Sequence, residues 1–368
     1  MEFQREKVFF GDRKPNLPAA PTSEEKRWLV NFADNNDCPL SKFVGNDKAR
    51  KVMATISYSS LGRDNHVAHE LAMAILGPSG TGKTTLVRLF AEMLGLPFME
   101  VGPKQIGCLD DIFKEIERTL KVSESPLVCH HKQDNFMLPP MVIFIDEVHA
   151  LSNSVVQGLL KATEFNDSML VTESGKTVNT ANVTWFIATT DSGRLFDAFR
   201  QRFMTIDLKP LSKPELAQVV KLNNDDWSDE VCELVAHYVP RNARKALEFA
   251  RYMRLTERMS QDSWTNVAAD VADTYGIDEH GMHETHLAVL KALGQAPVSR
   301  TRMVNVVGKK TEEIENYIMP WLEAASDDQP ALVTMSSKGY TITAAGVAEL
   351  TKRGLMHNPK AVANYKAA

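Results

Sequence analysis

The stretch from Leu71 to Leu94 constrains the fold of this 368-residue chain more than any other, and it reads LAMAILGPSGTGKTTLVRLFAEML. A short apolar run leads into a segment with the spacing Gly-x4-Gly-Lys-Thr, and an amphipathic segment follows. This order predicts a buried strand, a loop and a helix, which is the context that a phosphate-binding loop requires. Glycines let successive backbone N–H groups point at phosphate oxygens, and the positive end of the helix dipole adds to the attraction.

This loop predicts a nucleotide site in which individual residues have assignable roles. Lys83 would reach the β- and γ-phosphates, and the Thr84 hydroxyl would ligate Mg²⁺. A plain glycine-rich turn is the alternative, and the agreement of strand, loop, lysine, hydroxyl and helix disfavours it. The residues expected to surround the phosphates are Gly77, Pro78, Ser79, Gly80, Thr81, Gly82, Lys83, Thr84 and Thr85.

Two further apolar runs end in polar residues that suit the same chemistry. Five apolar residues, Met141 to Ile145, precede the carboxylates of Asp146 and Glu147. We expect Asp146 to hold the Mg²⁺ shell and Glu147 to orient the attacking water, because phosphoryl transfer depends mainly on positioning and charge stabilisation. The run 183–188 ends at Thr189 and Thr190, at the strand edge where ligands bind in open α/β sheets, so a hydroxyl there can sense the γ-phosphate. For Asp146 and Glu147, the alternative interpretation is a strand that simply ends in surface acids.

Three arginines are candidates for contacts with the nucleotide. Arg200 and Arg202 follow the second polar strand end, where one of them could reach into the site of a neighbouring subunit or merely cover a helix terminus. Arg241 follows Pro240 at the predicted start of a helix and could reach back to the nucleotide or lie in solvent. The segment with Phe43 and Val44 precedes a predicted helix, and in many oligomeric P-loop ATPases such a segment lies over the adenine ring.

The last region, residues 280–355, predicts a winged helix. Three helices, His286–Leu293, Arg300–Val307 and Glu312–Leu322, precede a hairpin with Ser337-Lys338-Gly339 at its tip. The net charge of −5 provides no global positive field, so DNA binding would need local patches or several subunits. A protein-binding winged helix is the alternative. The candidate DNA contacts are Arg300, Arg302, Lys309, Lys310 and Lys338.

Other features limit the class of protein. The sequence has no run of 18 apolar residues and no signal-peptide pattern at its start, so we expect a cytoplasmic protein. A polar excursion spans residues 123–140, and its triplet Cys129-His130-His131 indicates an exposed insertion more readily than a zinc site. Neither a disulfide framework nor a metal motif is indicated by the scattered cysteines, which are Cys38, Cys108, Cys129 and Cys232.

Several segments occur in the order seen in the RuvB family, the AAA+ motors of bacterial Holliday-junction branch migration, which the chain resembles from Ser41 to Gly354. The segments are GPSGTGKTTL, FIDEVHALS, a β-hairpin before FIATTDSG, FRQRF, VPRNARKALEFARYMR and YGIDEHGMHETHLAVLKAL. The ATPase motifs are common to many AAA+ proteins. The hairpin, the Pro-Arg-x-Ala helix and the winged helix together narrow the resemblance to this family.

The resemblance implies roles for individual residues. Lys83 and Thr84 resemble the Walker A pair, and Asp146 and Glu147 the Walker B pair. Thr189 or Thr190 is similar to the first sensor, Arg241 stands in the place of the second, and Arg200 or Arg202 in that of the arginine finger. The cofactors implied are ATP and Mg²⁺.

The resemblance also implies how the chain assembles and what it acts on. We expect a homo-hexameric ring on duplex DNA, which ATP hydrolysis moves, with the hairpin Met169–Asn179 docking a junction-binding partner, RuvA in the family. The chain departs from the family pattern in having Asp191 after the sensor threonines, a shorter hairpin and only Lys338 in the wing. The alternative function is that of an AAA+ loader, which places a helicase or clamp on DNA without translocating.

We therefore expect an α/β fold: an AAA+ P-loop domain with a parallel sheet, a small helical lid domain and a C-terminal winged helix. The expected divisions are an N-terminal arm (1–38), the large ATPase domain (39–208), the lid (209–278), the winged helix (279–356) and a C-terminal tail (357–368).

Overall fold

The structure is a computed structural model that describes residues 38–61, 72–123, 128–129, 135–164, 168–191, 193, 195–279, 281–314, 318–323, 330–336 and 339–355. The expected N-terminal arm, apart from Cys38, and the C-terminal tail lie outside the described residues. None of the helices in the described ranges is long and apolar enough to span a lipid bilayer.

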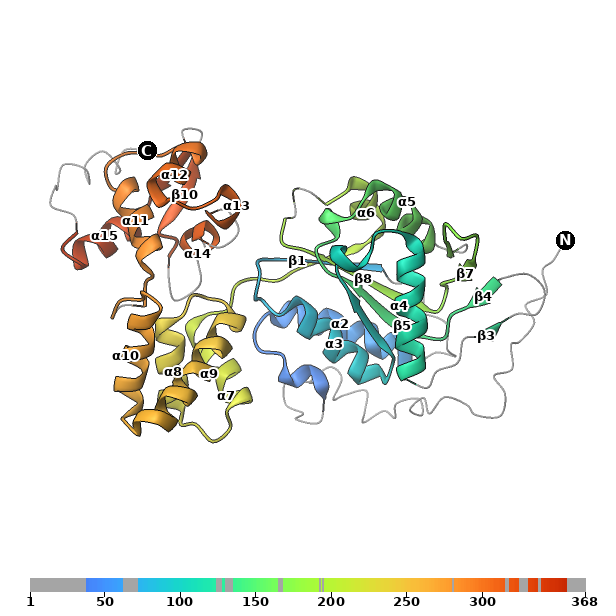
Figure 1. Ribbon diagram of the computed structural model, residues 1–368, viewed down its shortest axis with the longest axis horizontal. Coiled ribbons are helices and arrows are strands. Elements are labelled where there is room, and N and C mark those ends of the chain that lie inside the picture. Colours follow the sequence, from blue (N-terminus) through green and yellow to red (C-terminus); the bar gives the residue numbers. More distant parts are fainter. Residues whose placement is uncertain are drawn as a thin grey trace.

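A five-stranded parallel sheet forms the centre of the first unit (Figure 1). Its strand order, β2-β5-β8-β1-β9, places β1, which leads into the phosphate loop, between β8 and β9. The predicted parallel P-loop sheet is confirmed. The strands are β1 (Ala72–Leu76), β2 (Phe98–Val101), β5 (Met141–Ile145), β8 (Val183–Thr189) and β9 (Met204–Asp207).

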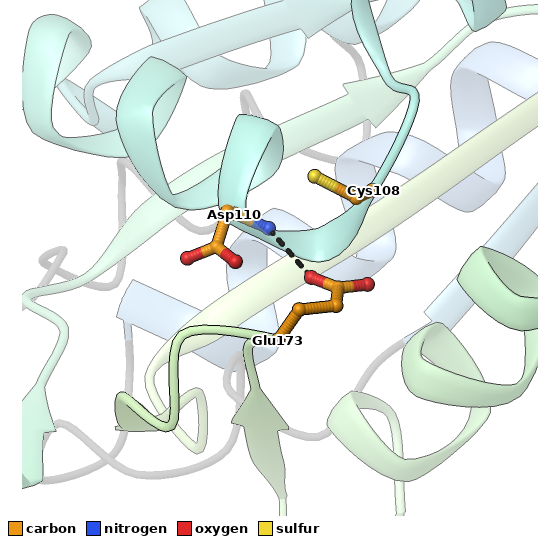
Figure 2. Close-up of side chains that lie close together, drawn as sticks. All are labelled: Cys108, Asp110 and Glu173. Atoms are coloured by element: carbon orange, nitrogen blue, oxygen red, sulfur yellow. Dashed lines mark hydrogen bonds between the residues drawn. The ribbon is translucent and has the colours of Figure 1, made fainter.

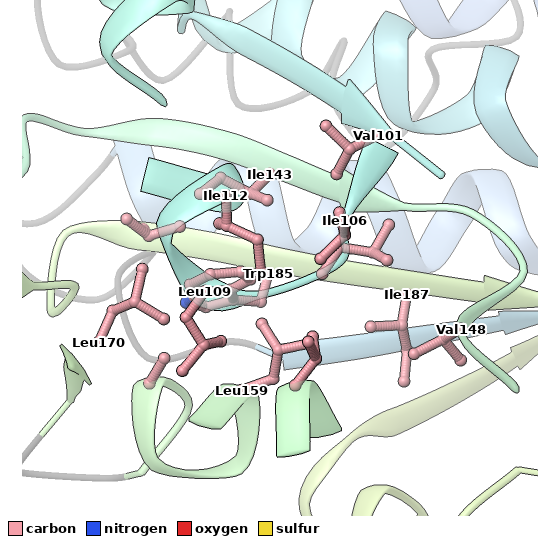
Figure 3. Packing of buried hydrophobic residues seen from close by; sticks show 14 of the residues in the cluster. Val101, Ile106, Leu109, Ile112, Ile143, Val148, Leu159, Leu170, Trp185 and Ile187 are labelled. Atoms are coloured by element: carbon pink, nitrogen blue, oxygen red, sulfur yellow. The ribbon is translucent and has the colours of Figure 1, made fainter. Parts of the chain in front are cut away.

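Helices cover both faces of this sheet, so its strands are apolar on both sides. Along β8, Trp185 and Ile187 join one buried cluster while Phe186 and Ala188 join the other, as the two-residue period of a strand requires. Figure 3 shows the first cluster, in which Ile112 of α4 and Leu159 of α5 pack near Trp185. The helices are α2 (Asp47–Leu61) and α3 (Lys83–Leu94) against one face, and α4 (Leu109–Val122), α5 (Asn153–Ala162) and the short α6 (Asp197–Arg202) against the other. Single 3₁₀ turns lie at Pro39–Lys42, Pro103–Gln105 and Val148–Ala150.

A second, smaller sheet contains the predicted hairpin. Strands β6 (Met169–Val171) and β7 (Thr177–Asn179) pair antiparallel, as expected. The expected polar excursion at 123–140 also contributes two strands, β3 (Val128–Cys129) and β4 (Asn135–Met137), and β4 pairs parallel with β7. The hairpin is therefore part of a four-stranded sheet of order β3-β4-β7-β6. The expected exposed insertion at 123–140 is therefore also part of a sheet. The local sequence contains no signal of this, because β4 pairs with a strand about 40 residues further along the chain.

The second unit is a bundle of four helices, α7 (Lys213–Asn223), α8 (Asp229–Tyr238), α9 (Ala243–Ser260) and α10 (Trp264–Thr274), around a core of its own. The start of α7 is fixed by a capping box between Ser212 and Glu215. The side chain of Asn242 caps α9 by accepting a hydrogen bond from Lys245 N at 3.1 Å.

The third unit has the expected winged-helix arrangement. Helices α11 (Glu284–Leu293) and α12 (Arg300–Val307) are followed by short segments α13 (Thr311–Glu313) and α14 (Met319–Glu323) and by the antiparallel wing β10 (Val333–Ser336) and β11 (Gly339–Ile342). The single helix expected at Glu312–Leu322 is described as two segments instead, on either side of residues 315–317, which lie outside the described part of the chain. A final helix, α15 (Ala344–Lys352), was not predicted; Val347 and Leu350 attach it to the core of this unit.

Candidate nucleotide site

The phosphate loop leaves β1 at Gly77 and enters α3 at Lys83, as predicted. Gly77, Gly80 and Gly82 have φ of +147°, +77° and +90°, values that a residue with a Cβ adopts only under strain. Gly77 also lies against β9, since a Cβ there would come within 2.5 Å of Leu208 O. The glycines are therefore needed both for the curl of the loop and for its close packing.

Lys83 is the first residue of α3, and its side chain returns over the loop. Its Nζ donates to Gly77 O at 2.9 Å and to Pro78 O at 3.1 Å, and only 7% of the residue is exposed. Burial lowers the pKa of Lys83, while the charges of Glu147 and Asp146 oppose that effect. An ammonium group is thus held at the mouth of the loop, near two carboxylates, where phosphate oxygens would replace its carbonyl partners.

The rest of the loop is compact. Thr81 is 2% exposed and donates from its hydroxyl to Pro78 O at 2.9 Å, which closes the loop on itself. Ser79 and Thr84 are partly buried, and Thr85 on the next position of α3 is exposed. Thr84, the predicted Mg²⁺ ligand, is thus the second residue of α3 and directly follows Lys83.

Asp146 and Glu147 follow β5 directly, and the register of the sheet brings them beside the loop. Burial raises the pKa of Asp146, and the charge of Glu147 raises it further, while Lys83 lowers it. Glu147 has a φ of +47°, which is rare for a residue other than glycine and is found more often at functional positions. The two carboxylates therefore point in different directions. Asp146 Oδ1 accepts from Glu147 N at 3.0 Å, whereas the Glu147 side chain points toward the end of β8.

The end of β8 holds Glu147 through Thr190. Thr190 donates from both its backbone N and its hydroxyl to Glu147 Oε2, each at 3.0 Å. Thr189 is 1% exposed and lies level with Leu76 of β1, which precedes the phosphate loop. Thr189 is thus the residue level with the end of β1 and Thr190 the one that binds Glu147, a difference that the sequence left open.

The sequence did not single out His149, which links Thr189 to Glu147. Its Nδ1 lies 2.7 Å from Thr189 Oγ1 and 3.3 Å from Glu147 Oε2. The 3₁₀ turn after Glu147 places the imidazole over the end of the neighbouring strand β8. A histidine two residues after a carboxylate pair was the available signal, but only the pairing of β5 with β8 shows what it contacts.

Phe43 and Val44 lie in a fixed loop beside the phosphate site. They are 4% and 6% exposed, and a Cβ on Gly82 would come within 2.9 Å of the Phe43 ring. Asn46 fixes the end of this loop, accepting from Lys209 N at 2.7 Å and donating to Lys209 O at 3.0 Å. The Phe43 ring therefore packs against the phosphate loop at Gly82.

The second unit reaches the phosphate loop through the start of α9. Asn242 donates from Nδ2 to Ser79 O at 2.9 Å, and Ala243 N donates to Gly80 O at 3.0 Å. Arg241, the predicted second sensor, directly precedes these contacts and is 6% exposed. Asn242 was not among the predicted site residues, because a capping asparagine has a sufficient local explanation.

Arg200 and Arg202 differ in their surroundings. Arg202 donates from Nη1 to Leu160 O at 2.5 Å and lies 3.5 Å from Glu164 Oε1, so it covers the end of α5. The side chain of Arg200 is 46% exposed, donates from Nε to Leu195 O at 3.2 Å and lies 4.0 Å from Asp197. The Arg202 side chain is 38% exposed, so the two arginines differ mainly in their partners: Arg202 is bound to the end of α5, and Arg200 contacts Leu195 and Asp197 near its own helix.

The tip of the hairpin is bound to the large unit. Glu173 accepts from Leu109 N at 3.0 Å and from Asp110 N at 3.1 Å, and so caps the start of α4. Figure 2 shows the hydrogen bond from Asp110 N to the Glu173 carboxylate. The Asp110 side chain in turn accepts from Ser174 N at 2.9 Å. The Cys108 thiol and the carboxylates of Asp110 and Glu173 each offer one possible metal ligand, and these atoms lie within 4.8 Å of one another. The backbone hydrogen bonds already account for where the Glu173 carboxylate lies.

The structure separates the candidate DNA contacts into two groups. Arg300 and Arg302 are exposed on the first turn of α12, whereas Lys309 and Lys310 follow its end, where Lys309 pairs with Glu313 at 3.2 Å. Lys338 lies outside the described residues.

Sequence comparison relates the chain to known ATPases. The model of the AAA family, ATPases associated with various cellular activities, matches residues 73–211. A "Holliday junction branch migration complex subunit RuvB" from Pseudarthrobacter chlorophenolicus is 27% identical over 332 residues, which is 84% of this chain and 84% of that protein. The protein of the same name from Tropheryma whipplei is 27% identical over 326 residues, covering 83% and 86%.

Structural comparison gives the same fold. The Thermotoga maritima RuvB Holliday junction branch migration motor superimposes with a TM-score of 0.66 at 20% identity, covering 87% of this chain and 98% of that one. A single-residue variant of the same motor superimposes with a TM-score of 0.64 at 20% identity, covering 85% of this chain and 96% of that one. The match therefore extends over all three units.

Proposed function

We propose that this chain, which is a divergent RuvB-like AAA+ ATPase, is an ATP-driven motor that moves duplex DNA at branched junctions of the Holliday type. The observation that carries the proposal is the extent of the match to the RuvB proteins. It covers 84% of both chains and includes the winged helix as well as the ATPase units. A common ATPase core alone would leave the biological role of the protein open.

ATP would bind between the loop amides and the lid. The N–H groups of the loop at Gly80 to Lys83, together with the Lys83 ammonium, would hold the phosphates, and Phe43 would lie beside the base. Lys83 would exchange two carbonyl partners for phosphate oxygens, a gain because a charge-assisted bond to an anion is stronger than one to a neutral acceptor.

The residues beside the loop fit a Mg²⁺ ion. Thr84 would supply a hydroxyl and Asp146 a carboxylate, which are oxygen ligands of the kind that Mg²⁺ prefers. The raised pKa of Asp146 arises from burial and from the charge of Glu147, and a divalent cation would offset both. When bound, the ion would neutralise charge on the β- and γ-phosphates.

Glu147 would then position the attacking water. In the structure its carboxylate is bound by Thr190 and lies 3.3 Å from His149, so it must turn away from these partners to reach a water near the γ-phosphate. Thr189, joined to the same histidine, is the group that the γ-phosphate would contact. Contact of the γ-phosphate with Thr189 would thus be linked to the release of Glu147 from Thr190, because His149 contacts both Thr189 and Glu147.

Self-assembly would complete the site. Arg200, which is not bound to α5, would stabilise the transferred phosphoryl group in a neighbouring subunit, as an arginine finger, within a homo-hexameric ring. Arg202, bound to the end of α5, would have a structural role.

DNA would be held through its phosphates by the third unit, with Arg300 and Arg302 on α12 and Lys309, Lys310 and Lys338 near the following turn and wing. A junction-binding partner would dock on the hairpin sheet at Met169–Asn179, away from its tip, because Glu173 and Ser174 are occupied by α4. A cytoplasmic location stays a prediction.

A branch-migration assay tests the proposal. A synthetic four-way junction is mixed with the protein, ATP and Mg²⁺, with and without a junction-binding protein, and strand exchange is followed on gels. We expect ATP-dependent migration by the wild type and none by Glu147→Gln, which should bind ATP without splitting it. DNA-stimulated hydrolysis with no movement of the junction under either condition would instead identify a loader.

The DNA surface has its own matched pair of variants. Arg302→Ala should weaken duplex binding and reduce the slope of log affinity against log salt by about 1, because one phosphate contact is lost. Thr301→Ala, at the exposed position between the two arginines of α12, should leave both quantities unchanged. Equal behaviour of the two variants would place the DNA elsewhere.

A further inference from the structure

The last turn of α8 is held by a lysine from the start of α7. Lys213, at the start of α7, donates from Nζ to the carbonyl oxygens of Ala236, His237 and Val239 at 2.6, 3.0 and 2.7 Å. Arg241 lies two residues beyond Val239, and its charge adds to the effect of burial in lowering the pKa of Lys213. The backbone that leads to Arg241 therefore starts at Val239, which Lys213 holds beside the end of α8.

The segment that leads to the third unit packs on the same turn. His237 donates from Nε2 to Glu279 O at 2.8 Å. Gly281, with a φ of +75°, lies so close to α8 that a Cβ would overlap His237 O. Gly281 thus lies against α8 at a distance that leaves no room for a Cβ.

The other side of this segment is bound by the third unit. Asp278 forms an ion pair with Arg353, which follows α15, and Asp278 Oδ1 also accepts from Met282 N at 2.9 Å. The Arg353 side chain is only 5% exposed, and its second carboxylate partner is Glu349 of α15 at 2.8 Å. A buried guanidinium depends on its carboxylates, because an unbalanced charge in the interior is strongly unfavourable.

We propose that residues 275–279 and 281–283 form a rigid joint through which the winged helix moves as one body with the lid. Contacts run from Lys213 to the end of α8, from His237 to Glu279 of the joint, and from Asp278 of the joint to Arg353. Figure 1 shows the joint between α10 of the lid and α11 of the winged helix. A shift of the lid when Arg241 engages a nucleotide is therefore passed to the DNA-binding unit. The nucleotide dependence rests on the proposed function, whereas the rigidity of the joint does not.

Spin-label distances test the rigidity. Non-cysteine labels at Arg258 on α9 and Thr301 on α12, both exposed, report the distance between lid and winged helix in the full-length chain. We expect one narrow distribution in the wild type, and one in Glu349→Gln, which weakens a partner of Arg353 within the third unit only. Asp278→Ala breaks the joint itself and should broaden the distribution about twofold.

A second pair of variants leaves the ion pair intact. Gly281→Ala forces the joint away from His237 and should broaden the distribution as well. Gly276→Ala is the matched control, because Gly276 also has a positive φ, +65°, but a Cβ there meets nothing closer than 3.8 Å. It should keep the narrow distribution. A broad distribution in the wild type, or a narrow one in both Asp278→Ala and Gly281→Ala, would overturn the proposal.

Activity measurements separate this proposal from the motor function. ATP hydrolysis without DNA should stay within about twofold of wild type in Asp278→Ala, since Asp278 is outside the nucleotide site, while stimulation by DNA should fall about tenfold. If the wild type itself shows no response to DNA, the motor function fails and the distance distributions still decide the joint.

Discussion

Gly80→Ala examines the contact between the phosphate loop and the lid. A Cβ at this position would overlap the amide group of Asn242, and the φ of +77° is unfavourable for alanine. Gly95→Ala, at the end of α3, is the control, since its φ is +64° and a Cβ there has nothing within 4 Å. Both changes carry the backbone strain of about 1 kcal/mol, but only the first displaces Asn242.

Displacing Asn242 removes two hydrogen bonds: the one from Nδ2 to Ser79 O and the capping bond from Lys245 N. Each is worth about 1 kcal/mol, so the start of α9 should lose roughly 2 kcal/mol of protection, or about 30-fold in opening equilibrium. Hydrogen–deuterium exchange of a peptide spanning residues 240–247, without nucleotide, measures this loss. It includes the amide of Ala243, which donates to Gly80 O.

We expect exchange in this peptide to become about 30-fold faster in Gly80→Ala and to stay unchanged in Gly95→Ala. The double variant Gly80→Ala/Asn242→Gly removes the overlap and tests whether the two residues act as a pair. Equal exchange in the two single variants would refute the contact between lid and loop, and additive effects in the double variant would refute its assignment to Asn242.

Three other predictions concern single residues. His149→Asn should lower kcat about tenfold with an unchanged KM for ATP, because the link between Glu147 and the sensing threonine is weakened; a changed KM alone would contradict this role. Arg200→Ala should reduce hydrolysis by about 10³-fold and Arg202→Ala by far less, and equal losses would argue against the assignment. The pKa of Lys213 is lowered to about 8 from 10.5, so the unfolded chain binds more protons between these values. The free energy of unfolding should therefore rise with pH across this window by up to about 3 kcal/mol relative to Lys213→Met. If the denaturation midpoints of the two proteins changed with pH in the same way, the prediction would be wrong.

Local sequence was sufficient for the elements whose signals lie within a few residues. The glycine spacing at Gly77, Gly80 and Gly82 specifies a curled loop wherever it occurs, because only glycine adopts these φ values without strain. Apolar runs ending in Asp146 and Glu147, or in Thr189, specify buried parallel strands whose polar ends share one edge of the sheet. The loop and the strand ends that make up the candidate nucleotide site were therefore predictable.

Contacts between distant segments needed the tertiary structure. The position of His149 depends on the pairing of β5 with β8, the strand β4 on a partner some 40 residues away, and the joint at Asp278 on an arginine 75 positions later. None of these leaves a periodic pattern, because each involves single residues brought together by packing. The different partners of Arg200 and Arg202 are likewise visible only in the folded chain, where α5 binds the guanidinium of Arg202.

Sequence alone thus determined the ATPase chemistry of this protein, since phosphate binding depends on residues that are adjacent in the chain. Tertiary structure decided how that chemistry connects to the lid and the winged helix, since these connections depend on charges and close approaches between units with separate cores. Short-range backbone geometry is encoded locally, whereas the pairing of Asp278 with Arg353 exists only once two cores have formed and met.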